Sequence, residues 1–449
     1  MTCQVGRRGR WLKLTAPVLL SLLLALVVWG INSGDRATEI ASPPATPSAS
    51  PSSSATPAPV PQPSPNPALT PSPRPTPEPT PPEELRPVLA QCEVSHLTAA
   101  DWGPSLAQWR QAEQAVADMS VAEQAGYVLL PQWNGSSGKS ARLAVSEVGA
   151  SGLILMGGNI TSPQQVRDLT AAVQQHQQDM GRDWSAIISV DEEGGRVSRL
   201  AGIIPSLDTF RSYGDLDEPL RTETDFKVLG ASMADLGVTM NFAPVADVSF
   251  GPADTTIGDR SAGNDPLLVS RTVVAAASGL QDAGIIPVLK HFPGHGSVAE
   301  DSHVTLPRQD ATVTQLRESD WVGFLDAVAQ GAPVVMMGHI LVPDIDPENV
   351  SSLSPATYDL LRTELGFAGL IVTDALNMSA VTAGRTPQEV AVQALGAGAD
   401  LLLMPVDPPA TRDGIVAAVE TGDLSADRLS CAATRITALQ IYQRDLGTA

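Results

Sequence analysis

The 449-residue sequence has little of what marks several large classes of protein. It contains only three cysteines, so it is not a small domain stapled by disulfide bonds. Its formal net charge is −21 and it has no long basic stripe, which argues against binding to nucleic-acid phosphates. No G-x-G-x-x-G motif follows the first apolar run of the globular region, so nothing favours a dinucleotide-binding fold. The chain is long enough for one large domain or two ordinary ones.

The extreme N-terminus is basic and then apolar. Four basic residues precede the apolar run at 14–31, namely Arg7, Arg8, Arg10 and Lys13. About 18 apolar residues are roughly the minimum that spans a bilayer, and this order is typical of a signal peptide or signal anchor at residues 1–34 rather than a buried core helix. Neither a clear A-x-A cleavage site nor a lipid-accepting cysteine follows, which favours an uncleaved anchor with its charged end in the cytoplasm.

A proline-rich segment follows the apolar run. Residues 42–82 hold nearly half of the 38 prolines, together with many serines and threonines. Such a segment cannot bury a core and favours extended polyproline II conformers. We therefore expect residues 35–90 to be a disordered, semi-rigid stalk that holds a domain at 91–449 outside the membrane, either anchored or secreted. The membrane is a partner only if the N-terminal helix is uncleaved.

The cysteines fit an exported chain. Cys3 lies in the predicted cytoplasmic tail, whereas Cys92 and Cys431 flank the globular region. In an oxidising compartment Cys92 and Cys431 would be able to form a disulfide bond that joins the two ends of the domain. Two unrelated buried thiols are the alternative.

Short apolar runs alternate with helical stretches through the globular region. Eight runs are strand candidates, at 127–131, 152–156, 186–191, 238–244, 285–290, 333–339, 369–374 and 400–405. Continuous runs of Val, Ile, Leu and Met are typical of parallel strands buried on both faces. The intervals leave room for helices, as at 161–178, where Thr161 or Ser162 would be the N-cap. This pattern predicts an α/β fold of the TIM-type (β/α)8 barrel class as a single catalytic domain, with a doubly wound sheet as the alternative.

Polar residues gather at the ends of the predicted strands, where barrel enzymes build their active sites. They are Asp191, Asn241, Asp247, Lys290, His291, His339 and Asp374. Any one of them would be an ordinary loop residue, and Asp374 would also suit a helix N-cap. Together they predict a site, with Asp374 as a nucleophile or general base.

The stretch LKHFPGHGSVAEDSHVTLP at 289–307 holds three of the six histidines. His291 and His295 have the i, i+4 spacing of helical metal ligands, but the Pro and Gly residues between and beside them prevent a stable helix, so no metal or other cofactor is expected. Asp301 and His303 are two apart and project to the same side of an extended segment. The carboxylate would hold the imidazole tautomer, as in an acid/base dyad, although a surface pair is the alternative.

Six motifs together resemble the bacterial β-N-acetylhexosaminidases of glycoside hydrolase family 3. They are KHFPGHGSVAEDSHVTLP, VDEEGGRVSRL (190–200), NFAPVADV (241–248), GDRSAG (258–263), SLSPATYDLLRTELGFAGLIVTDALNM (352–378) and ADLLLMP (399–405). They occur in the family's order over residues 100–447. The resemblance implies a retaining hydrolase of terminal β-linked N-acetylglucosamine on one barrel, acting on glycans or muropeptides from peptidoglycan. It needs no cofactor, and we expect a monomer.

The resemblance also implies a role for each matching residue. Asp374 would be the nucleophile, and His303 the general acid/base assisted by Asp301. The residues at sugar-holding positions are Asp191, Arg199, Arg260, Lys290 and His291. An imidazole titrates near pH 6.5 without tuning, so it suits a group that first donates and later accepts a proton.

Two positions depart from the family pattern. Glu192 replaces a common Gln and Ala262 a usual aromatic residue, so we expect a roomier or more acidic sugar pocket there. The second α/β domain of larger relatives that act on glucosides is not seen after the last predicted strand, which favours the hexosaminidase branch. A phosphorolytic glycosidase, a β-glucosidase and a catalytically dead cell-wall-binding barrel are the alternatives.

Overall fold

The computed structural model describes residues 102–250, 254–296, 298 and 306–446. The predicted anchor at 1–34 and stalk at 35–90 lie outside these ranges, so both stay predictions. Within the described ranges, no helix is both long enough and apolar enough to cross a membrane.

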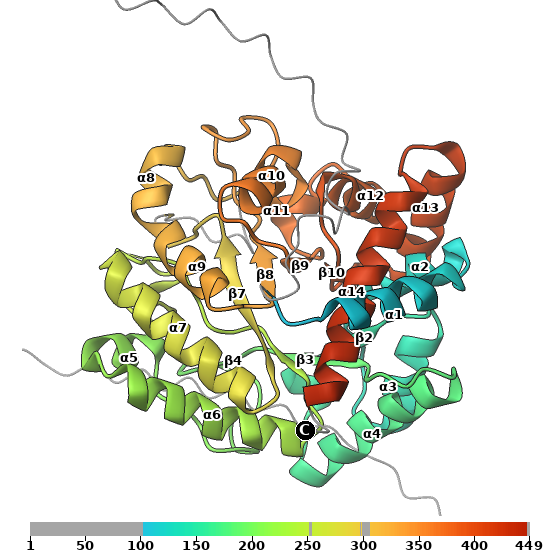
Figure 1. The fold of residues 1–449 in the computed structure, drawn as a ribbon, viewed down its shortest axis with the longest axis horizontal. Helices are drawn as coiled ribbons and strands as arrows, with labels where there is room; N and C mark the ends of the chain where they lie inside the picture. The colour runs from blue at the N-terminus through green and yellow to red at the C-terminus, as the bar shows by residue number, and fades with distance from the viewer. Residues whose placement is uncertain (1–101, 251–253, 297, 299–305, 447–449) are drawn as a thin grey trace, which may run out of the picture. The chain divides into compact units, whose positions relative to one another are not determined.

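Eight short parallel strands form the centre of the domain (Figure 1). They are β1 (Leu129–Leu130), β2 (Gly152–Leu155), β3 (Ile187–Val190), β6 (Met240–Asn241), β7 (Ile286–Phe292), β8 (Val334–Met337), β9 (Leu370–Thr373) and β10 (Leu402–Leu403). Each lies within or overlaps one of the eight predicted apolar runs. Their Val, Ile, Leu and Met side chains are buried in one core, which explains why runs without polar alternation mark these strands.

The sheet curls until its first and last strands meet. Six strands form one sheet in the order β2-β3-β6-β7-β8-β9, and β1 pairs with β10 so that Leu129 lies opposite Leu402. Ile154 N donates to Pro131 O at 3.1 Å on one side of this pair, and Thr373 N donates to Leu401 O at 3.0 Å on the other. The predicted α/β class with a barrel-like parallel sheet is therefore confirmed. A doubly wound open sheet would keep its first and last strands apart.

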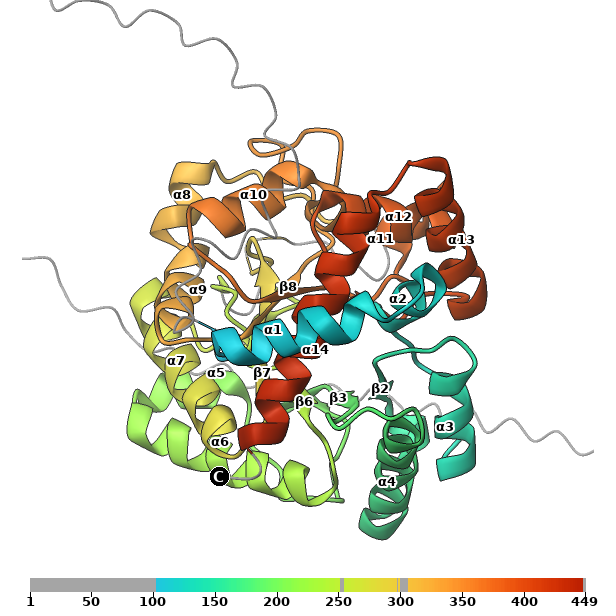
Figure 2. The same cartoon turned by 45° about the vertical axis from the view of Figure 1, so that its right-hand side comes forward.

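Helices cover the outside of the barrel (Figures 1 and 2). They are α1 (Leu106–Ala117), α2 (Val121–Tyr127), α3 (Gly138–Ser146), α4 (Pro163–Asp179), α5 (Phe210–Leu216), α6 (Pro219–Asp235), α7 (Pro266–Asp282), α8 (Val313–Glu318), α9 (Asp320–Ala329), α10 (Pro355–Thr363), α11 (Ser379–Thr382), α12 (Pro387–Ala397), α13 (Pro408–Thr421) and α14 (Ala426–Leu446). Ser162 caps α4 as predicted, because its side-chain oxygen accepts from Gln165 N at 3.2 Å.

Smaller elements stand in the loops at the carboxyl ends of the strands. An antiparallel hairpin, β4 (Glu192–Gly194) and β5 (Val197–Ser198), follows β3. Short 3₁₀ helices lie at η3 (Gly157–Asn159), η4 (Gly258–Arg260) and η5 (Ser351–Leu353). Of these elements, β4, β5 and η4 present side chains to the mouth of the barrel, namely Glu193, Val197 and Arg260.

A cluster of buried charged side chains lies at the opposite end of the barrel. Asp400, just before β10, is buried and accepts from three arginines, at 3.0 Å from Arg362, 2.9 Å from Arg428 and 3.3 Å from Arg435. Burial alone would raise the pKa of Asp400, but the three guanidinium groups hold it below its usual range. These four residues, the basal cluster, tie α10 and α14 to the start of β10.

Candidate active site

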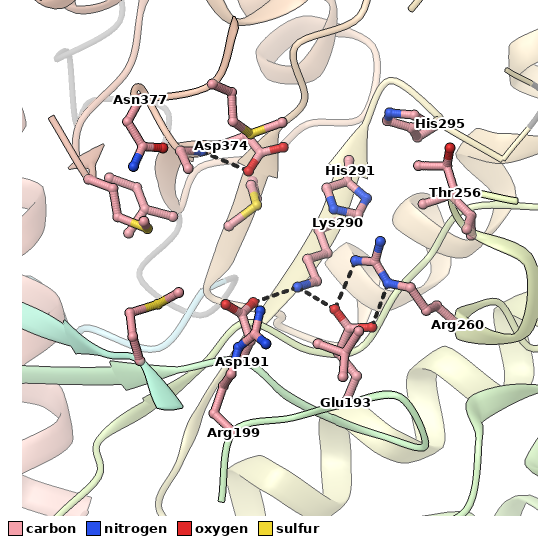
Figure 3. Close-up of a pocket in the computed structure, with 18 residues that line it drawn as sticks. Asp191, Glu193, Arg199, Thr256, Arg260, Lys290, His291, His295, Asp374 and Asn377 are labelled. Atoms are coloured by element: carbon pink, nitrogen blue, oxygen red, sulfur yellow. Dashed lines mark hydrogen bonds and ion pairs between the residues drawn. The ribbon is translucent and has the colours of Figure 1, made fainter. Parts of the chain in front are cut away.

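A cavity of about 350 Å³ opens at the carboxyl ends of the strands (Figure 3). Its polar lining comes from the end of β7 and from the segments after β3, β6, β7 and β9, and is Asp191, Glu193, Arg199, Thr256, Arg260, Lys290, His291, His295, Asp374 and Asn377. Its apolar lining includes four methionines, Met156, Met336, Met378 and Met404. One side of the cavity is therefore ionic, whereas the rest is largely apolar.

Alternating charges form the ionic wall, which we define as Asp191, Glu193, Arg260 and Lys290. Lys290 Nζ lies 2.9 Å from Asp191 Oδ1 and 2.6 Å from Glu193 Oε1. Arg260 binds Glu193 through two parallel bonds, Nε to Oε2 at 2.8 Å and Nη2 to Oε1 at 2.9 Å. Burial alone would raise the pKa of Glu193, but Arg260 and Lys290 hold it well below its usual value. Glu193 is thus an ionised link that fixes both cations.

Two consecutive residues of β7 face the same cavity. In a regular strand Lys290 and His291 would point to opposite faces. The pairing of β7 with β8 shifts register between Leu289 and Phe292, and this irregularity accompanies the presence of both side chains in the cavity lining. The local break in the ladder explains how a lysine and a histidine adjacent in sequence serve one site.

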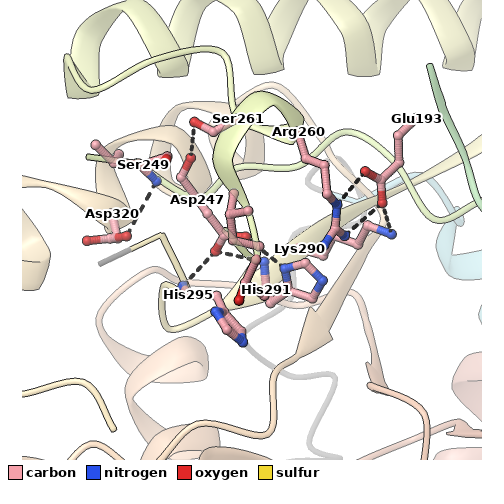
Figure 4. A network of polar contacts seen from close by, with 12 residues as sticks. Glu193, Asp247, Ser249, Arg260, Ser261, Lys290, His291, His295 and Asp320 are labelled. Carbon is pink, nitrogen blue, oxygen red and sulfur yellow. Dashed lines mark hydrogen bonds and ion pairs between the residues drawn. The ribbon is translucent and has the colours of Figure 1, made fainter. Parts of the chain in front are cut away.

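Asp247 anchors the start of the histidine-rich loop (Figure 4). Its Oδ2 lies 2.7 Å from His291 Nδ1, and its Oδ1 accepts from the backbone N–H groups of His291 at 3.1 Å and His295 at 2.7 Å. Asp247 is fully buried, and despite that burial the two histidines lower its pKa. Because the carboxylate accepts from Nδ1, the Nε2 atom of His291 is the ring nitrogen left to meet a ligand.

The turn after this anchor needs a glycine. Gly294 has φ +129°, and a Cβ atom there would lie 2.5 Å from the Asp320 side chain. Asp320 begins α9, and burial raises its pKa to about 7, with Asp247 adding to the effect. The glycine of this motif therefore lets the backbone pass directly over a buried carboxyl group.

Asp374 stands across the cavity from the ionic wall. Its backbone N–H continues the sheet by donating to Met337 O at 2.9 Å, and its Oδ1 accepts from Ala375 N at 2.7 Å. Burial would raise its pKa, but the charges of His339 and His291, the Ala375 N–H and Lys290 lower it to about 2. Asp374 is a carboxylate at neutral pH, as a nucleophile must be.

The structure brings six of the predicted site residues around this one cavity, namely Asp374, Asp191, Arg199, Arg260, Lys290 and His291. The predicted acid/base residues Asp301 and His303 lie outside the described residues, so their placement stays a prediction. Cys92 also lies outside, while Cys431 is buried on α14 with its Sγ 3.3 Å from Arg435 Nη1. The predicted disulfide likewise stays a prediction.

The two positions that depart from the family pattern lie outside the cavity lining. Glu192 and Ala262 are fully buried and do not line the cavity, so Glu192 adds no carboxylate to its lining. The expected roomier pocket stays a prediction. Glu192 instead accepts from Ser198 Oγ at 2.5 Å and Leu200 N at 2.8 Å. It braces the hairpin that leads to Arg199.

Sequence reasoning missed several residues of the site. Glu193 lies in the DEEGG motif two residues after Asp191, a spacing that suits two side chains on one face, and this was the available signal. The sequence places Asp247 after a predicted strand but indicates no role for it. His295, which the sequence singles out only by its spacing from His291, also lines the cavity. Among the described residues, no group of three or more His, Cys, Asp or Glu side chains is placed to hold a metal ion.

The domain combines a barrel-like α/β fold with an ionised carboxylate that faces the ionic wall. This arrangement suits an enzyme that acts on a hydroxyl-rich substrate. Comparison with known proteins gives the family. The model of the glycosyl hydrolase family 3 N-terminal domain matches residues 112–439. The chain belongs to this family and is a glycoside hydrolase.

Relatives of the chain include β-hexosaminidases. The β-hexosaminidase LpqI of Mycobacterium tuberculosis is 40% identical over 268 residues, which cover 56% of this chain and 67% of that protein. A solved structure titled M tuberculosis LpqI matches with a TM-score of 0.67 and 31% identity, covering 73% of this chain and 96% of the other. A family 3 β-N-acetylglucosaminidase from Paenibacillus matches with a TM-score of 0.71 and 34% identity, over 74% of this chain. The match spans 64% of that longer protein.

Proposed function

We propose that the protein is a retaining exo-β-N-acetylhexosaminidase that removes terminal β-linked N-acetylglucosamine. The observation that carries this proposal is the cavity at the mouth of the barrel, in which ionised Asp374 faces the ionic wall. At about 350 Å³ the cavity is at the small end of ligand pockets, which suits one terminal sugar rather than a long stretch of polymer. The β-hexosaminidase and β-N-acetylglucosaminidase relatives support the choice of sugar.

The proposed reaction has two displacements. Oδ1 of Asp374 is held by Ala375 N–H, so Oδ2 attacks the anomeric carbon as the glycosidic C–O bond breaks. His303, assisted by Asp301, gives its proton to the departing oxygen. Water then attacks the glycosyl–Asp374 ester, and His303 takes a proton from it, which restores both residues and releases the sugar.

The wall provides the donors and acceptors for sugar hydroxyl groups. Asp191 has a side chain that is 20% exposed and accepts, whereas Lys290 and Arg260 donate. Arg199 and His291 complete this set in the cavity lining. Because Glu193 already fixes both cations, little ordering remains to be done when the sugar binds.

The proposed setting is extracytoplasmic, and the proposed substrates are fragments of peptidoglycan. The basic and apolar N-terminus followed by a proline-rich stalk supports export, with the domain anchored or secreted. Muropeptides carry the β-linked N-acetylglucosamine that the site would remove.

The test is a substrate panel on the full-length protein. We expect hydrolysis of an aryl β-N-acetylglucosaminide and of muropeptides, slower turnover of the matching aryl β-glucoside, and no sugar 1-phosphate when phosphate is added. A 2-fluoro glycoside should leave a covalent adduct on Asp374 that mass spectrometry locates. Release of a sugar phosphate would replace hydrolysis by phosphorolysis.

Asp374→Ala and His303→Ala are the matched variants for this panel. Each should lose about 10³-fold or more in kcat, the size usual for removing a group central to covalent or acid/base catalysis. Full activity in either variant would overturn the mechanism. Binding without any sugar release by the unaltered protein would leave only a carbohydrate-binding barrel.

A further inference from the structure

His339 lies directly behind the nucleophile without lining the cavity. It follows β8 and is fully buried. Both of its ring nitrogens have partners: Nδ1 lies 2.7 Å from Ser352 Oγ, and Nε2 lies 3.0 Å from the carbonyl oxygen of Ala375. A carbonyl oxygen only accepts, so Nε2 must carry the proton. The ring is therefore locked between η5 and the residue that follows Asp374.

Ala375 links this histidine to the reacting carboxylate. Its N–H holds Asp374 Oδ1 at 2.7 Å, while its carbonyl oxygen accepts from His339 and, at 3.1 Å, from Met378 N. The backbone of Asp374 is tied separately to Met337 O. The orientation of Ala375 thus decides which carboxylate oxygen is occupied and which one faces the sugar.

We propose that His339 and Ser352 are positioning residues for the nucleophile: they hold Ala375 so that its N–H occupies Oδ1 of Asp374 and leaves Oδ2 aimed at the anomeric carbon. This inference rests on the proposed function, in which Asp374 is the nucleophile. Ser352 is itself fixed, because its carbonyl oxygen accepts from Tyr358 Oη at 3.0 Å. The brace therefore reaches from α10 through η5 and His339 to the cavity.

The electrostatics of the site agree with the geometry. Burial works against ionisation of Asp374, and the charge of His339 is the first of those that lower its pKa, ahead of His291. A brace that also supplies favourable charge would support both the direction and the ionisation of the carboxylate.

Two neighbouring serines provide a matched test. Ser352 and Ser351 are both buried in η5, but Ser351 Oγ donates to the backbone oxygen of Ile340 at 2.8 Å. Ser352→Ala removes the partner of His339, whereas Ser351→Ala removes a comparable buried hydrogen bond that does not involve His339. The measurement is the rate of covalent adduct formation on the full-length protein with a 2-fluoro glycoside, normalised to the folded fraction.

We expect Ser352→Ala to slow adduct formation about 10- to 100-fold, the range seen when an outer partner of a functional group is removed. KM should change little, and Ser351→Ala should stay within about 2-fold of the unaltered protein. Equal rates in the two serine variants would overturn the positioning role. Failure of the unaltered protein to form any adduct would instead overturn the proposed nucleophile, so the two failures are distinguishable.

A second pair of variants covers the case in which Ser352→Ala does not fold. His339→Gln keeps a side-chain N–H donor for Ala375 O, whereas His339→Leu has none. We expect His339→Gln to form the adduct at least about 5-fold faster than His339→Leu at equal folded fraction, since one buried hydrogen bond contributes about 1 kcal/mol. Equal rates in these two variants would show that His339 only fills space.

Discussion

Two groups of buried charges stand at opposite ends of the same barrel, and they are built differently. The ionic wall at the mouth alternates two carboxylates with two cations and borders a cavity (Figure 3). The basal cluster sets three arginines around Asp400, with backbone carbonyls as further partners, including Gly369 O for Arg362 and Leu395 O for Arg428. Charges that border a cavity can serve a ligand, whereas charges sealed by the backbone can only hold elements together.

Removing the carboxylate of the basal cluster should give the largest effect on stability. Asp400→Asn leaves three buried guanidinium groups without their counter-charge, and we expect about 3–5 kcal/mol of destabilisation from the loss of such a partner. Chemical denaturation measures it. The folded fraction should keep its kcat/KM, because the cluster lies away from the mouth.

An exposed pair is the control for Asp400→Asn. Asp217 binds Arg271 with both side chains 41–50% exposed, so Asp217→Asn should cost less than about 1 kcal/mol. Equal losses in the two variants would show that the basal cluster is no more important to stability than a surface ion pair.

Removing a charge from the ionic wall should have the opposite effect to Asp400→Asn, with a large loss of activity and a smaller loss of stability. Glu193→Gln keeps the size of the side chain but removes the charge that fixes Arg260 and Lys290. We expect kcat/KM for an aryl β-N-acetylglucosaminide to fall about 10- to 100-fold, as for other outer partners of a binding group. The accompanying loss of stability should be smaller than for Asp400→Asn. If Glu193→Gln unfolded while its folded fraction kept full kcat/KM, the ionic wall would serve stability like the basal cluster, and the proposed difference between the two would be wrong.

The pH dependence of adduct formation tests whether the nucleophile Asp374 is ionised, as the charges around the cavity imply. The pKa of Asp374 is lowered to about 2, so its stabilising contribution is present above the unfolded value and is lost only as pH falls through about 2. Asp374 should therefore remain a carboxylate from pH 7 down to pH 4. Adduct formation with an activated 2-fluoro glycoside, whose leaving group needs no proton, should vary less than about 2-fold over this range. A tenfold fall between pH 6 and pH 4 would show that the nucleophile itself titrates there.

The smallest effect is expected at the residue next to Glu193. Glu192 is equally buried but faces Ser198 and Leu200 rather than the cavity. Glu192→Gln retains an oxygen that can accept a hydrogen bond, so kcat/KM should change less than about 3-fold. If Glu192→Gln matched Glu193→Gln in lost activity, the distinction between lining and bracing carboxylates would be wrong.

Much of the barrel was predictable because burial on both faces leaves a strong signal. Even β1 and β10, with two residues each, lie within long apolar runs, and the strand-end position alone pointed to Asp191, Lys290 and Asp374. The directions in which side chains point were harder to predict from the sequence. That Glu193 lines the cavity while Glu192 does not agrees with the alternation of side chains along β4, and the two-residue spacing of Glu193 from Asp191 was the signal in the sequence. The hydrogen bond from Ser198 to Glu192 was not predictable, because it depends on how β4 pairs with β5.

Partners distant in the sequence were also beyond prediction. Asp247 meets His291 only because the backbone after β6 keeps pairing with β7, with Ala246 N donating to Lys290 O at 2.7 Å. Similarly, Arg428 and Arg435 lie seven positions apart on one face of α14, which acquires meaning only once that helix packs beneath Asp400. In both cases, the fold had to be known before the residues could be paired.

The seam between β1 and β10 has a consequence for how the domain is made. Leu129 and Leu130 find their sheet partners in Leu402 and Leu403, late in the sequence, and α1 packs on α14 (Figure 2). During synthesis β1 therefore cannot pair with β10 until nearly all of the domain has emerged. Until then, the edges of these two strands that meet in the closed barrel stay unpaired and can pair with other strands. The barrel can close only after β10, its last strand, has been synthesised.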